Sequence, residues 1–542
     1  MTDNNLIFLP LGGTGEIGMN VTLYGYKGRW IMVDCGAGFA DAELPGIDIV
    51  VADISFIEER RDDLLAIIIT HIHEDHCGAL PYLWDRLAVP IYTTQFTANF
   101  LLKKIGRDKV QFPIHVVEPG KLLHLGEFTL EFINMTHSVP EMSAIAIHTA
   151  DEVVIHSGDW KIDDDPVVGK TCDFKRLEEL SEKGVLAMVC DSTNVFSQGK
   201  SESESSLREP LKEVISNASG ACVVTLFSSN IARIETVTRI ANEYGKTVVV
   251  LGRSLLSVIS AAKESGYLGD LNYIDEIGLA QYNGSRKSLI ILATGCQGDE
   301  LAAVNRLSQG THKSFTINAD DTIIFSSKMI PGNEKRIAKM INRFIAMGVN
   351  VVTERTHSVH VSGHPYRDEL KQLYQLLKPK ILIPVHGENL HLHEHAKFAL
   401  ECGVENTLIA ADGDIIEISS ASGARKIDQT EVGFWCVDND RLQHPDSHVI
   451  KTRKRLQLSG MILVILVMNK KGKSLKRPTI VAFGYSEEGG WKENALASID
   501  RSLKTDKNSD FRTITKAVRK IVRGSLTSRI KIPLIEVQIE RV

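Results

Sequence analysis

Four potential metal ligands lie within six residues of this sequence, directly after the apolar run LAIIIT. They are His71, His73, Asp75 and His76 in the segment HIHEDH. Crowding three imidazoles and a carboxylate together costs solvation energy and brings like charges together on protonation, unless a cation compensates. Along an extended turn, His71 and His73 can face one ion while Asp75 and His76 reach a second. The segment therefore predicts a centre for two metal ions at the end of a β-strand.

The pattern around this segment predicts a layered fold with an inserted domain. In the first 200 residues, short β-rich runs alternate with more helical stretches, which is typical of α/β or α+β architecture. The polar run SESESS at residues 201–206 is a plausible boundary, and a second α/β block follows it. We predict that residues 1–204 and 351–430 form one domain in two parts, 205–350 an inserted domain, 431–450 a linker, and 451–542 a small α+β domain.

Charge is distributed unevenly along the chain. The net charge of -6 argues against a nucleic-acid partner, because Lys and Arg supply most non-specific affinity for phosphates. Residues 451–542, however, contain 21 Lys and Arg against 8 Asp and Glu, which gives them +13 and leaves -19 for residues 1–450. Such asymmetry indicates an anionic partner such as nucleic acid. A basic face that is only solvated remains the alternative.

Composition predicts a cytoplasmic protein without a membrane segment. The longest strongly apolar run, residues 461–468, is far shorter than the roughly 20 residues of a membrane span and predicts a buried strand. The N-terminal segment lacks the basic stretch of a secretory signal. The eight cysteines are scattered and form no CxxC pair, which indicates reduced thiols.

Three glycines near the N-terminus spell a pattern that is typical of dinucleotide binding. Gly13, Gly15 and Gly18 form GxGxxG after a strand-like run, but the residues that follow alternate and end in another strand instead of a helix. We therefore expect a hairpin or tight loop, in which glycine supplies positive φ angles.

The HxHxDH motif at a strand end resembles the metallo-β-lactamase superfamily of hydrolases. The pattern of that superfamily expects four further groups in a fixed order, and the sequence contains each of them. The resemblance implies that His71, His73 and His137 hold one ion, that Asp75, His76 and His386 hold the other, that Asp159 bridges them and that Asp34 orients a ligand. The implied fold is the αββα sandwich of the superfamily.

His386 follows Asp159 by 227 positions, which leaves room for the inserted domain. Superfamily members with such a cap form the β-CASP subfamily, which acts on nucleic acids. The β-CASP motifs resemble Asp191 in CDSTN, His360 in HSVHVSGHP, and His386. The segments LGGTGEIGMN, HSGDWKID, SSNIARIETV, TGCQGDE and HVSGH narrow the resemblance to the bacterial ribonuclease J family, over roughly three quarters of the chain. The stretch VFSQGKSESESS departs from the pattern of that family.

This resemblance implies metal-dependent hydrolysis of RNA. Two divalent ions can supply a nucleophile near neutral pH and neutralise charge on a phosphodiester. Zn is the preferred metal for a His-rich site with carboxylates, and Mn is an alternative. Asp75 and Asp159 would orient the attacking water, while His360, paired with Asp191, would protonate the departing 3′ oxygen.

A second group of residues predicts a pocket for phosphate. Ser362, Gly363 and His364 offer donors in a compact turn, although an ordinary Ser-Gly turn would have the same sequence. The resemblance implies that the substrate's 5′-monophosphate is bound by Ser229, Asn230, Ile231, His360, Val361, Ser362, Gly363 and His364. A pocket at a fixed distance from the metals favours stepwise 5′→3′ removal of nucleotides, and occasional internal cuts are compatible with it.

Other functions are compatible with the same ligands. A small-molecule hydrolase such as a thioesterase or lactonase would share them, but would need neither a cap nor a basic terminal domain. A DNA-processing β-CASP nuclease and a non-catalytic RNA-binding scaffold are further alternatives, although the complete ligand set argues against the scaffold. The resemblance favours single-stranded, 5′-monophosphorylated RNA as substrate, a role in the processing and decay of ribosomal and messenger RNA, and a homodimer or homotetramer.

Overall fold

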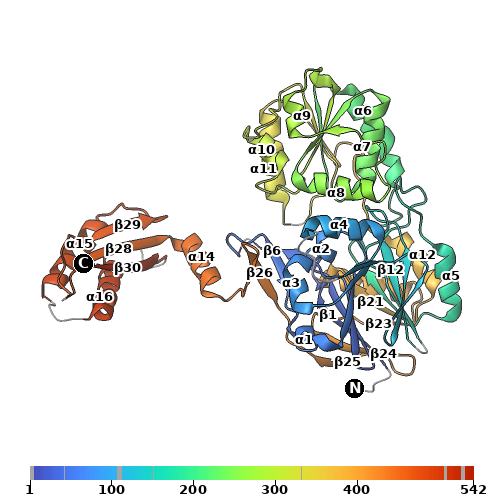
Figure 1. Ribbon diagram of the computed structural model, residues 1–542, viewed down its shortest axis with the longest axis horizontal. Helices are drawn as coiled ribbons and strands as arrows, with labels where there is room; N and C mark the ends of the chain where they lie inside the picture. The colour runs from blue at the N-terminus through green and yellow to red at the C-terminus, as the bar shows by residue number, and fades with distance from the viewer. Residues whose placement is uncertain are drawn as a thin grey trace. The chain divides into compact units, whose positions relative to one another are not determined.

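The computed structural model describes residues 5–41, 43–106, 113–149, 152–330, 332–470, 472–505, 510–526 and 531–542. The chain divides into two compact units, shown in Figure 1. The first comprises Met1–Gly38 and Val51–Gly433, and the second comprises Phe39–Val50 and Phe434–Val542. All predicted site residues belong to the first unit.

Two large sheets enclose the main hydrophobic core of the first unit. One has the strand order β25-β24-β1-β3-β4-β7-β8-β9 and the other β10-β11-β12-β13-β14-β21-β23. The strands of the first sheet are β1 (Leu6–Gly12), β3 (Val21–Tyr26), β4 (Arg29–Val33), β7 (Leu64–Ile68), β8 (Ile91–Thr93), β9 (Ile114–Val116), β24 (Asp414–Ser419) and β25 (Gly423–Gln429). Those of the second are β10 (Leu122–Leu125), β11 (Phe128–Asn134), β12 (Ser143–His148), β13 (Val153–His156), β14 (Ala187–Asp191), β21 (Ile381–Val385) and β23 (Asn406–Thr407). Phe8 from one sheet and Phe132 from the other belong to the same buried cluster.

Helices flank these two sheets, which confirms the predicted αββα sandwich (Figure 1). They are α1 (Ser55–Glu58), α2 (Glu74–Cys77), α3 (Leu80–Leu87), α4 (Gln95–Ile105), α5 (Phe174–Lys183), α12 (Arg367–Leu377) and α13 (Asn389–Glu401). Helix α3 illustrates the packing, because it buries Leu80, Leu83, Trp84 and Leu87 at the spacing of one helical face.

The inserted domain is built around a third, entirely parallel sheet with the order β17-β16-β18-β15-β19-β20. Its strands are β15 (Cys222–Thr225), β16 (Thr247–Leu251), β17 (Tyr273–Ile274), β18 (Leu289–Ala293), β19 (Thr322–Phe325) and β20 (Asn350–Thr353). Its helices are α6 (Arg208–Asn217), α7 (Ile231–Glu243), α8 (Arg253–Glu264), α9 (Glu276–Ala280), α10 (Ala303–Ser308) and α11 (Glu334–Ala346). The central strands are almost continuously apolar, because helices must cover both faces of a parallel sheet.

The polar run at residues 201–206 lies between sandwich and insertion, but it is well anchored. The hydroxyl of Ser201 donates to Glu369 Oε1 at 2.7 Å. The Glu204 carboxylate is buried and lies 3.0 Å from the guanidinium of Arg233 in α7. Removing one partner of such a buried pair would leave the other charge uncompensated. The run therefore forms a polar joint, which its composition alone did not indicate.

The second unit contains a hairpin where the sequence suggested only a linker, at residues 431–450. Strands β26 (Phe434–Asp438) and β27 (Arg441–Gln443) pair in antiparallel fashion and join β5 (Ala37–Phe39) and β6 (Ile49–Ala52) in one sheet. The turn residues Asn439 and Asp440 have φ angles of 49° and 61°. Asn and Asp tolerate this conformation, which suits a two-residue hairpin turn.

The remainder of the second unit is the predicted small α+β domain. It consists of α14 (His448–Ser459), β28 (Met461–Met468), β29 (Thr479–Phe483), α15 (Trp491–Thr505), α16 (Phe511–Ser525) and β30 (Leu534–Arg541). The strand predicted at residues 461–468 is present, but only alternate side chains are buried. Ile462, Val464, Leu466 and Met468 cluster with residues of α15 and α16, so the helices cover one face of the sheet.

Two further expectations concern the whole described chain. Its helices include none that is both long and apolar enough to span a membrane. All eight cysteines are free, and seven of them are buried.

Candidate metal centre

Loops at the ends of strands present the predicted ligands at one edge of the sandwich. His71 and His73 follow β7, His137 follows β11, Asp159 follows β13, and His386 follows β21. Asp34 and His386 have positive φ angles of 63° and 54°, a costly conformation for residues with a side chain. The chain therefore turns sharply just where these two side chains enter the site.

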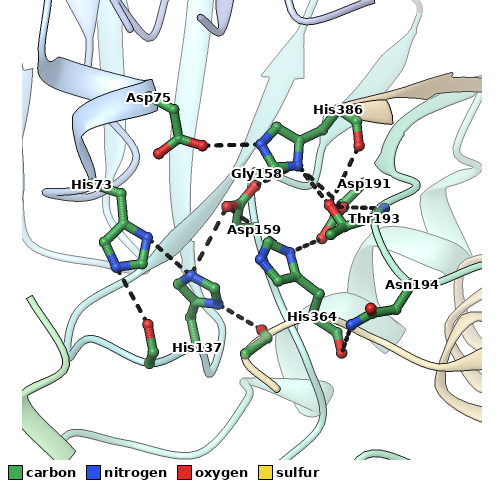
Figure 2. A network of polar contacts seen from close by, with 12 residues as sticks. His73, Asp75, His137, Gly158, Asp159, Asp191, Thr193, Asn194, His364 and His386 are labelled. Atoms are coloured by element: carbon green, nitrogen blue, oxygen red, sulfur yellow. Dashed lines mark hydrogen bonds and ion pairs between the residues drawn. The ribbon is translucent and has the colours of Figure 1, made fainter. Parts of the chain in front are cut away.

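The ligands form overlapping clusters around one carboxylate, as Figure 2 shows for several of them. One cluster contains His71, His73, His137 and Asp159, and a second contains Asp75, His76, Asp159 and His386. In each cluster the candidate ligand atoms lie within 4.8 Å of one another. A third cluster combines Asp159 and His386 with Asp191 and His364. The structure thus brings the predicted ligands together around Asp159, which belongs to every one of these clusters.

Three imidazoles on one side, two of them buried and that of His73 half-buried, have lowered pKa values, which favours the neutral form that binds metals. His71 Nε2 lies 3.0 Å from His73 Nδ1, which lies 3.2 Å from His137 Nε2. Burial lowers the pKa of His71 and His137 well below the usual value and that of His73 to about 4, and neighbouring imidazoles reinforce the effect. These side chains are therefore neutral near pH 7, and their nitrogen lone pairs converge as metal ligands do.

Carboxylates dominate the other side of the centre. Burial opposes charge on His76 and His386, yet nearby carboxylates, above all Asp159, raise the pKa of both imidazoles well above the usual value. Within the described residues, the buried Asp159 Oδ1 has no hydrogen-bond partner. Such a concentration of negative charge requires a positive partner, and a divalent cation satisfies the requirement. The donor set of the described residues thus fits divalent metal ions.

Several neighbours fix the orientation of these ligands. The Asp34 carboxylate lies 2.7 Å from His76 Nδ1 and accepts the backbone N–H of Thr70 at 2.9 Å. His137 Nδ1 lies 2.6 Å from the carbonyl oxygen of Gly363, to which it can donate. Hydrogen bonds of this kind set the tautomer and direction of a ligating imidazole. The placement of Asp34 agrees with its predicted orienting role.

The expected pairing of Asp191 with His360 is absent, because His364 occupies that place. His364 Nδ1 lies 2.7 Å from Asp191 Oδ2 and 4.0 Å from Asp159 Oδ2 (Figure 2). Burial alone would lower the pKa of His364, but Asp191 and Asp159 raise it. His364 therefore retains a proton more readily than an ordinary histidine. Both histidines lie in HVSGH four residues apart, and only the path of the turn distinguishes them.

His360 lies instead among cations. Burial lowers the pKa of His360 well below the usual value, and Arg233, Lys328 and Lys161 lower it further. Its Nδ1 is buried and has no hydrogen-bond partner within the described residues. This positive surrounding suits an anion, so His360 fits the predicted phosphate pocket better than the predicted proton transfer.

The two segments of the predicted phosphate pocket do converge. The guanidinium of Arg233, in the first turn of α7, donates to the carbonyl oxygen of Val359 at 2.9 Å. Asn230 caps the same helix, because its side chain accepts the backbone N–H of Arg233 at 2.9 Å. The N-terminus of α7, which favours anions, is thereby tied to the residue that precedes His360.

Ser362 is prepared to donate a hydrogen bond. Its hydroxyl oxygen accepts from Asn194 Nδ2 at 2.7 Å and from the backbone N–H of His364 at 3.2 Å. Both of these bonds use lone pairs and leave the hydroxyl proton for another acceptor. Lys328, which is not among the residues predicted from the sequence, places its ammonium 3.3 Å from Asn194 Oδ1. The lysine follows β19 in FSSKMIPGNE, and its position after a buried strand was the available signal.

The glycine pattern near the N-terminus forms a tight loop, as expected. Gly13, Gly15 and Gly18 have φ angles of 90°, 86° and 118°. The carbonyl oxygen of Gly13 accepts the backbone N–H of His386 at 2.7 Å. Strand β2 (Thr14–Gly15) also pairs with β22 (Gly387–Glu388), so the loop positions a metal ligand.

Comparison with known proteins identifies three matching family models. Residues 14–168 match the metallo-beta-lactamase superfamily, 219–344 match the beta-CASP domain of ribonuclease J, and 348–408 match the Zn-dependent metallo-hydrolase RNA specificity domain. The second match covers most of the inserted domain, and the other two cover much of the sandwich.

Similar proteins match over most of their length. A ribonuclease J from Sinorhizobium meliloti is 39% identical over 100% of this chain and 98% of its own. A ribonuclease J from Mycolicibacterium smegmatis is 34% identical over 94% of this chain and 93% of its own length. One from Helicobacter pylori is 34% identical over 86% of this chain and 68% of its own length. A crystal structure of a protein of unknown function from Enterococcus faecalis has a TM-score of 0.54 at 16% identity, covers 76% of this chain and 100% of its own, and supports the fold alone.

Proposed function

The chain belongs to the ribonuclease J family and is a metal-dependent ribonuclease, and we propose that it removes nucleotides stepwise from the 5′ end of single-stranded RNA bearing a 5′-monophosphate. The observation that carries the proposal is the HVSGH turn. Gly363 contacts the metal ligand His137, and the neighbouring Ser362 has a hydroxyl proton to offer. A phosphate bound at this turn would lie a short, fixed distance from the centre.

The metal ions follow from the donor clusters. Two divalent ions per chain would activate water and neutralise charge on the phosphodiester. His71, His73 and His137 would hold one ion, Asp75, His76 and His386 would hold the other, and Asp159 would serve both. Zn is preferred because imidazoles predominate, and Mn is the alternative, since no thiolate belongs to these clusters.

The residues around the ions would move protons and orient the attacking water. Asp75 and Asp159 carry carboxylates that can accept hydrogen bonds from a water molecule at the centre. His364 keeps its proton through Asp191 and lies beside Asp159, so it is the group that would protonate the departing 3′ oxygen. Asp191 itself is held by the backbone N–H of Thr193 at 2.8 Å.

The phosphate pocket would combine neutral donors with a positive field. Ser362 offers its hydroxyl, Ser229 and Ile231 flank the capped N-terminus of α7, and Lys328 supplies an exposed cation. A 5′-monophosphate carries more negative charge than an internal phosphodiester, so it would gain most from these groups. Selection of the 5′ end follows from this difference.

The cellular setting is inferred from composition. Eight free cysteines, none of them in a disulfide, support a reducing compartment, and we place the protein in the cytoplasm. Its function there would be the processing and decay of ribosomal and messenger RNA. We also propose that the protein forms a homodimer or homotetramer. We further propose that it cleaves RNA internally as well as from the 5′ end.

The decisive experiment compares RNAs that differ only at the 5′ end. The purified enzyme, with its metal content measured, is given the same oligonucleotide with a 5′-monophosphate, 5′-triphosphate or 5′-hydroxyl. Successive mononucleotides should appear fastest from the 5′-monophosphate. Equal rates for all three RNAs would refute selection of the 5′ end, and faster hydrolysis of matched DNA would place the chain with DNA-processing β-CASP nucleases.

A further inference from the structure

An aromatic pair, formed by the exposed Phe196 and the half-buried His391, lies beside the catalytic centre and has no role in the proposed reaction. The rings of Phe196 and His391 meet edge to face, with centroids 5.3 Å apart and an interplanar angle of 70°. Phe196 remains 46% exposed, although a benzyl side chain gains free energy from burial. An aromatic face that stays in water next to a nucleic-acid site suggests a bound base.

Both rings are connected directly to catalytic elements. Phe196 lies two residues after Asn194, whose amide donates to Ser362 at 2.7 Å. His391 belongs to the first turn of α13, which begins three residues after the metal ligand His386. A Cβ atom placed on Gly387 would lie only 2.8 Å from that of His391. The two rings thus lie on segments that also carry the metal ligand His386 and the hydrogen-bond donor to Ser362.

Charges at the centre also act on His391. Burial lowers the pKa of this histidine, Glu388 and Asp191 oppose the decrease, and Lys328 and His386 reinforce it. The imidazole is therefore neutral near pH 7. A neutral ring does not attract phosphate, but its edge supports the ring of Phe196.

The loop that carries Phe196 is fixed before any substrate arrives. The carbonyl oxygen of Val195 accepts from Arg367 Nε at 2.8 Å, and that of Ser197 accepts the backbone N–H of Arg367 at 3.1 Å. Val195 is completely buried. Because both neighbours of Phe196 are anchored to α12, the aromatic ring loses little freedom when a planar partner binds.

We propose that Phe196, supported by His391, is a stacking platform for one nucleobase of the RNA strand at the metal centre. Successive bases of single-stranded nucleic acids stack on aromatic side chains whatever their sequence, because every base has a π face. Lys328, beside Asn194, supplies a cation for the backbone of the same strand. The platform positions the strand and takes no part in proton transfer.

This inference rests on the ribonuclease activity and deepens the proposed function, and abasic substrates test it. A 5′-monophosphorylated RNA of about ten nucleotides is prepared with one abasic site at each position in turn. Cleavage by the metal-loaded wild type is compared with cleavage by Phe196→Ala, Phe196→Leu and Phe196→Trp. Tyr244→Ala is the matched control, because Tyr244 is 44% exposed in the inserted domain and has no place in the site. Thermal unfolding and metal content confirm that each variant is folded and loaded.

With RNA that contains no abasic site, Phe196→Ala should raise KM about 5- to 30-fold and change kcat far less. The reason is that stacking contributes equally to the ground state and the transition state. Phe196→Trp should keep KM near the wild-type value, and Phe196→Leu should give a KM between those of the wild type and Phe196→Ala. When the abasic site lies at the position that stacks on Phe196, the wild type should show the same increase in KM. Phe196→Ala should cause no further increase with that substrate. Such non-additivity is the mark of two groups in contact.

The proposal is overturned if the two losses multiply at every abasic position, or if Phe196→Ala behaves like Tyr244→Ala. Failure of the 5′-end proposal gives a different result. In that case the wild type treats 5′-monophosphate and 5′-hydroxyl RNA alike, while the coupling between Phe196 and one base persists.

Discussion

The two sides of the catalytic centre are held in place by different forces. On the strand-end side, HIHEDH brings three imidazoles and a carboxylate off β7, and their nitrogen and oxygen atoms face one another at 3.0–3.7 Å. On the loop side, the HVSGH turn is held by direct hydrogen bonds, from Asn194 to Ser362 and from His137 to Gly363. The first arrangement offers clustered ligand atoms that fit metal ions, whereas Ser362 and Gly363 in the second already have hydrogen-bond partners within the protein.

This difference indicates a division of labour. Groups that crowd around Asp159 form the site for ions, and loss of one ligand should disable every reaction. Groups that are already hydrogen bonded but keep a spare donor recognise the substrate, and their loss should affect only substrates that use the donor. The predictions below test that division, in order of decreasing effect.

His76→Ala is expected to reduce RNA cleavage to the limit of detection. The substitution removes a ligand of the second cluster and the partner of Asp34, while the surrounding strands remain packed. Loss of a group that only orients a ligand already costs about 10- to 100-fold, so loss of a ligand should cost more. Metal content and thermal unfolding are measured alongside. Near-normal hydrolysis with one metal per chain would contradict the two-ion centre.

On the loop side, His364→Ala should lower kcat about 100- to 10,000-fold, which is the usual contribution of a general acid. His360→Ala should leave kcat much less affected, because the histidine paired with Asp191 is His364. A substrate with sulfur as the departing 3′ atom needs no protonation, so it should restore cleavage by His364→Ala. If His360→Ala lost more activity than His364→Ala, the assignment of the proton donor would be reversed.

The sequence predicts the strand-end side far better than the loop side, for a physical reason. Ligands in HIHEDH are placed by the local geometry of a strand end and the turn that follows, and Asp34, His137, Asp159 and His386 follow other strands in order. The partner of Asp191, in contrast, depends on a turn more than 160 residues away in the sequence. Because His360 and His364 are chemically identical, only the path of that turn distinguishes them.

Outside the site, the alternation of β-rich and helical runs indicated an inserted α/β block and a terminal α+β domain, and the family resemblance implied the αββα sandwich. The sequence pattern did not predict the anchored joint at residues 201–206, because the buried pair of Glu204 and Arg233 joins segments that are distant in sequence. It also missed the β26–β27 hairpin, where Asn439 and Asp440 provide a turn without the glycine that usually indicates one.

Ser362→Ala is expected to slow degradation of 5′-monophosphorylated RNA about 10- to 150-fold, the value of one hydrogen bond to a charged group. 5′-hydroxylated RNA and internal cleavage of a long transcript should be affected much less. Ser216→Ala, at a partly exposed serine of α6, is the matched control. An equal decrease for all three substrates would mean that Ser362 supports the turn and does not recognise the 5′ end.

The smallest effect is expected from the second unit, which contributes charge but no ligand of the centre. Helix α16 exposes Lys516, Lys520 and Arg523 on the face opposite its buried Ile514 and Val518. Changing these three cations to Glu leaves the apolar face intact, so the unit should stay folded. If they contact single-stranded RNA, each lost contact should decrease the slope of log affinity against log salt by about 0.7.

Deleting residues 447–542, which contain the whole local charge of +13, should have the larger effect of the two changes. RNA affinity at low salt should then fall, or the oligomer should dissociate, while metal content and cleavage of very short RNAs remain normal. The triple Glu variant distinguishes these explanations, because it alters charge without removing the sheet that could mediate assembly. An unchanged salt dependence together with unchanged assembly in the deletion would show that the basic residues of the second unit are only solvated.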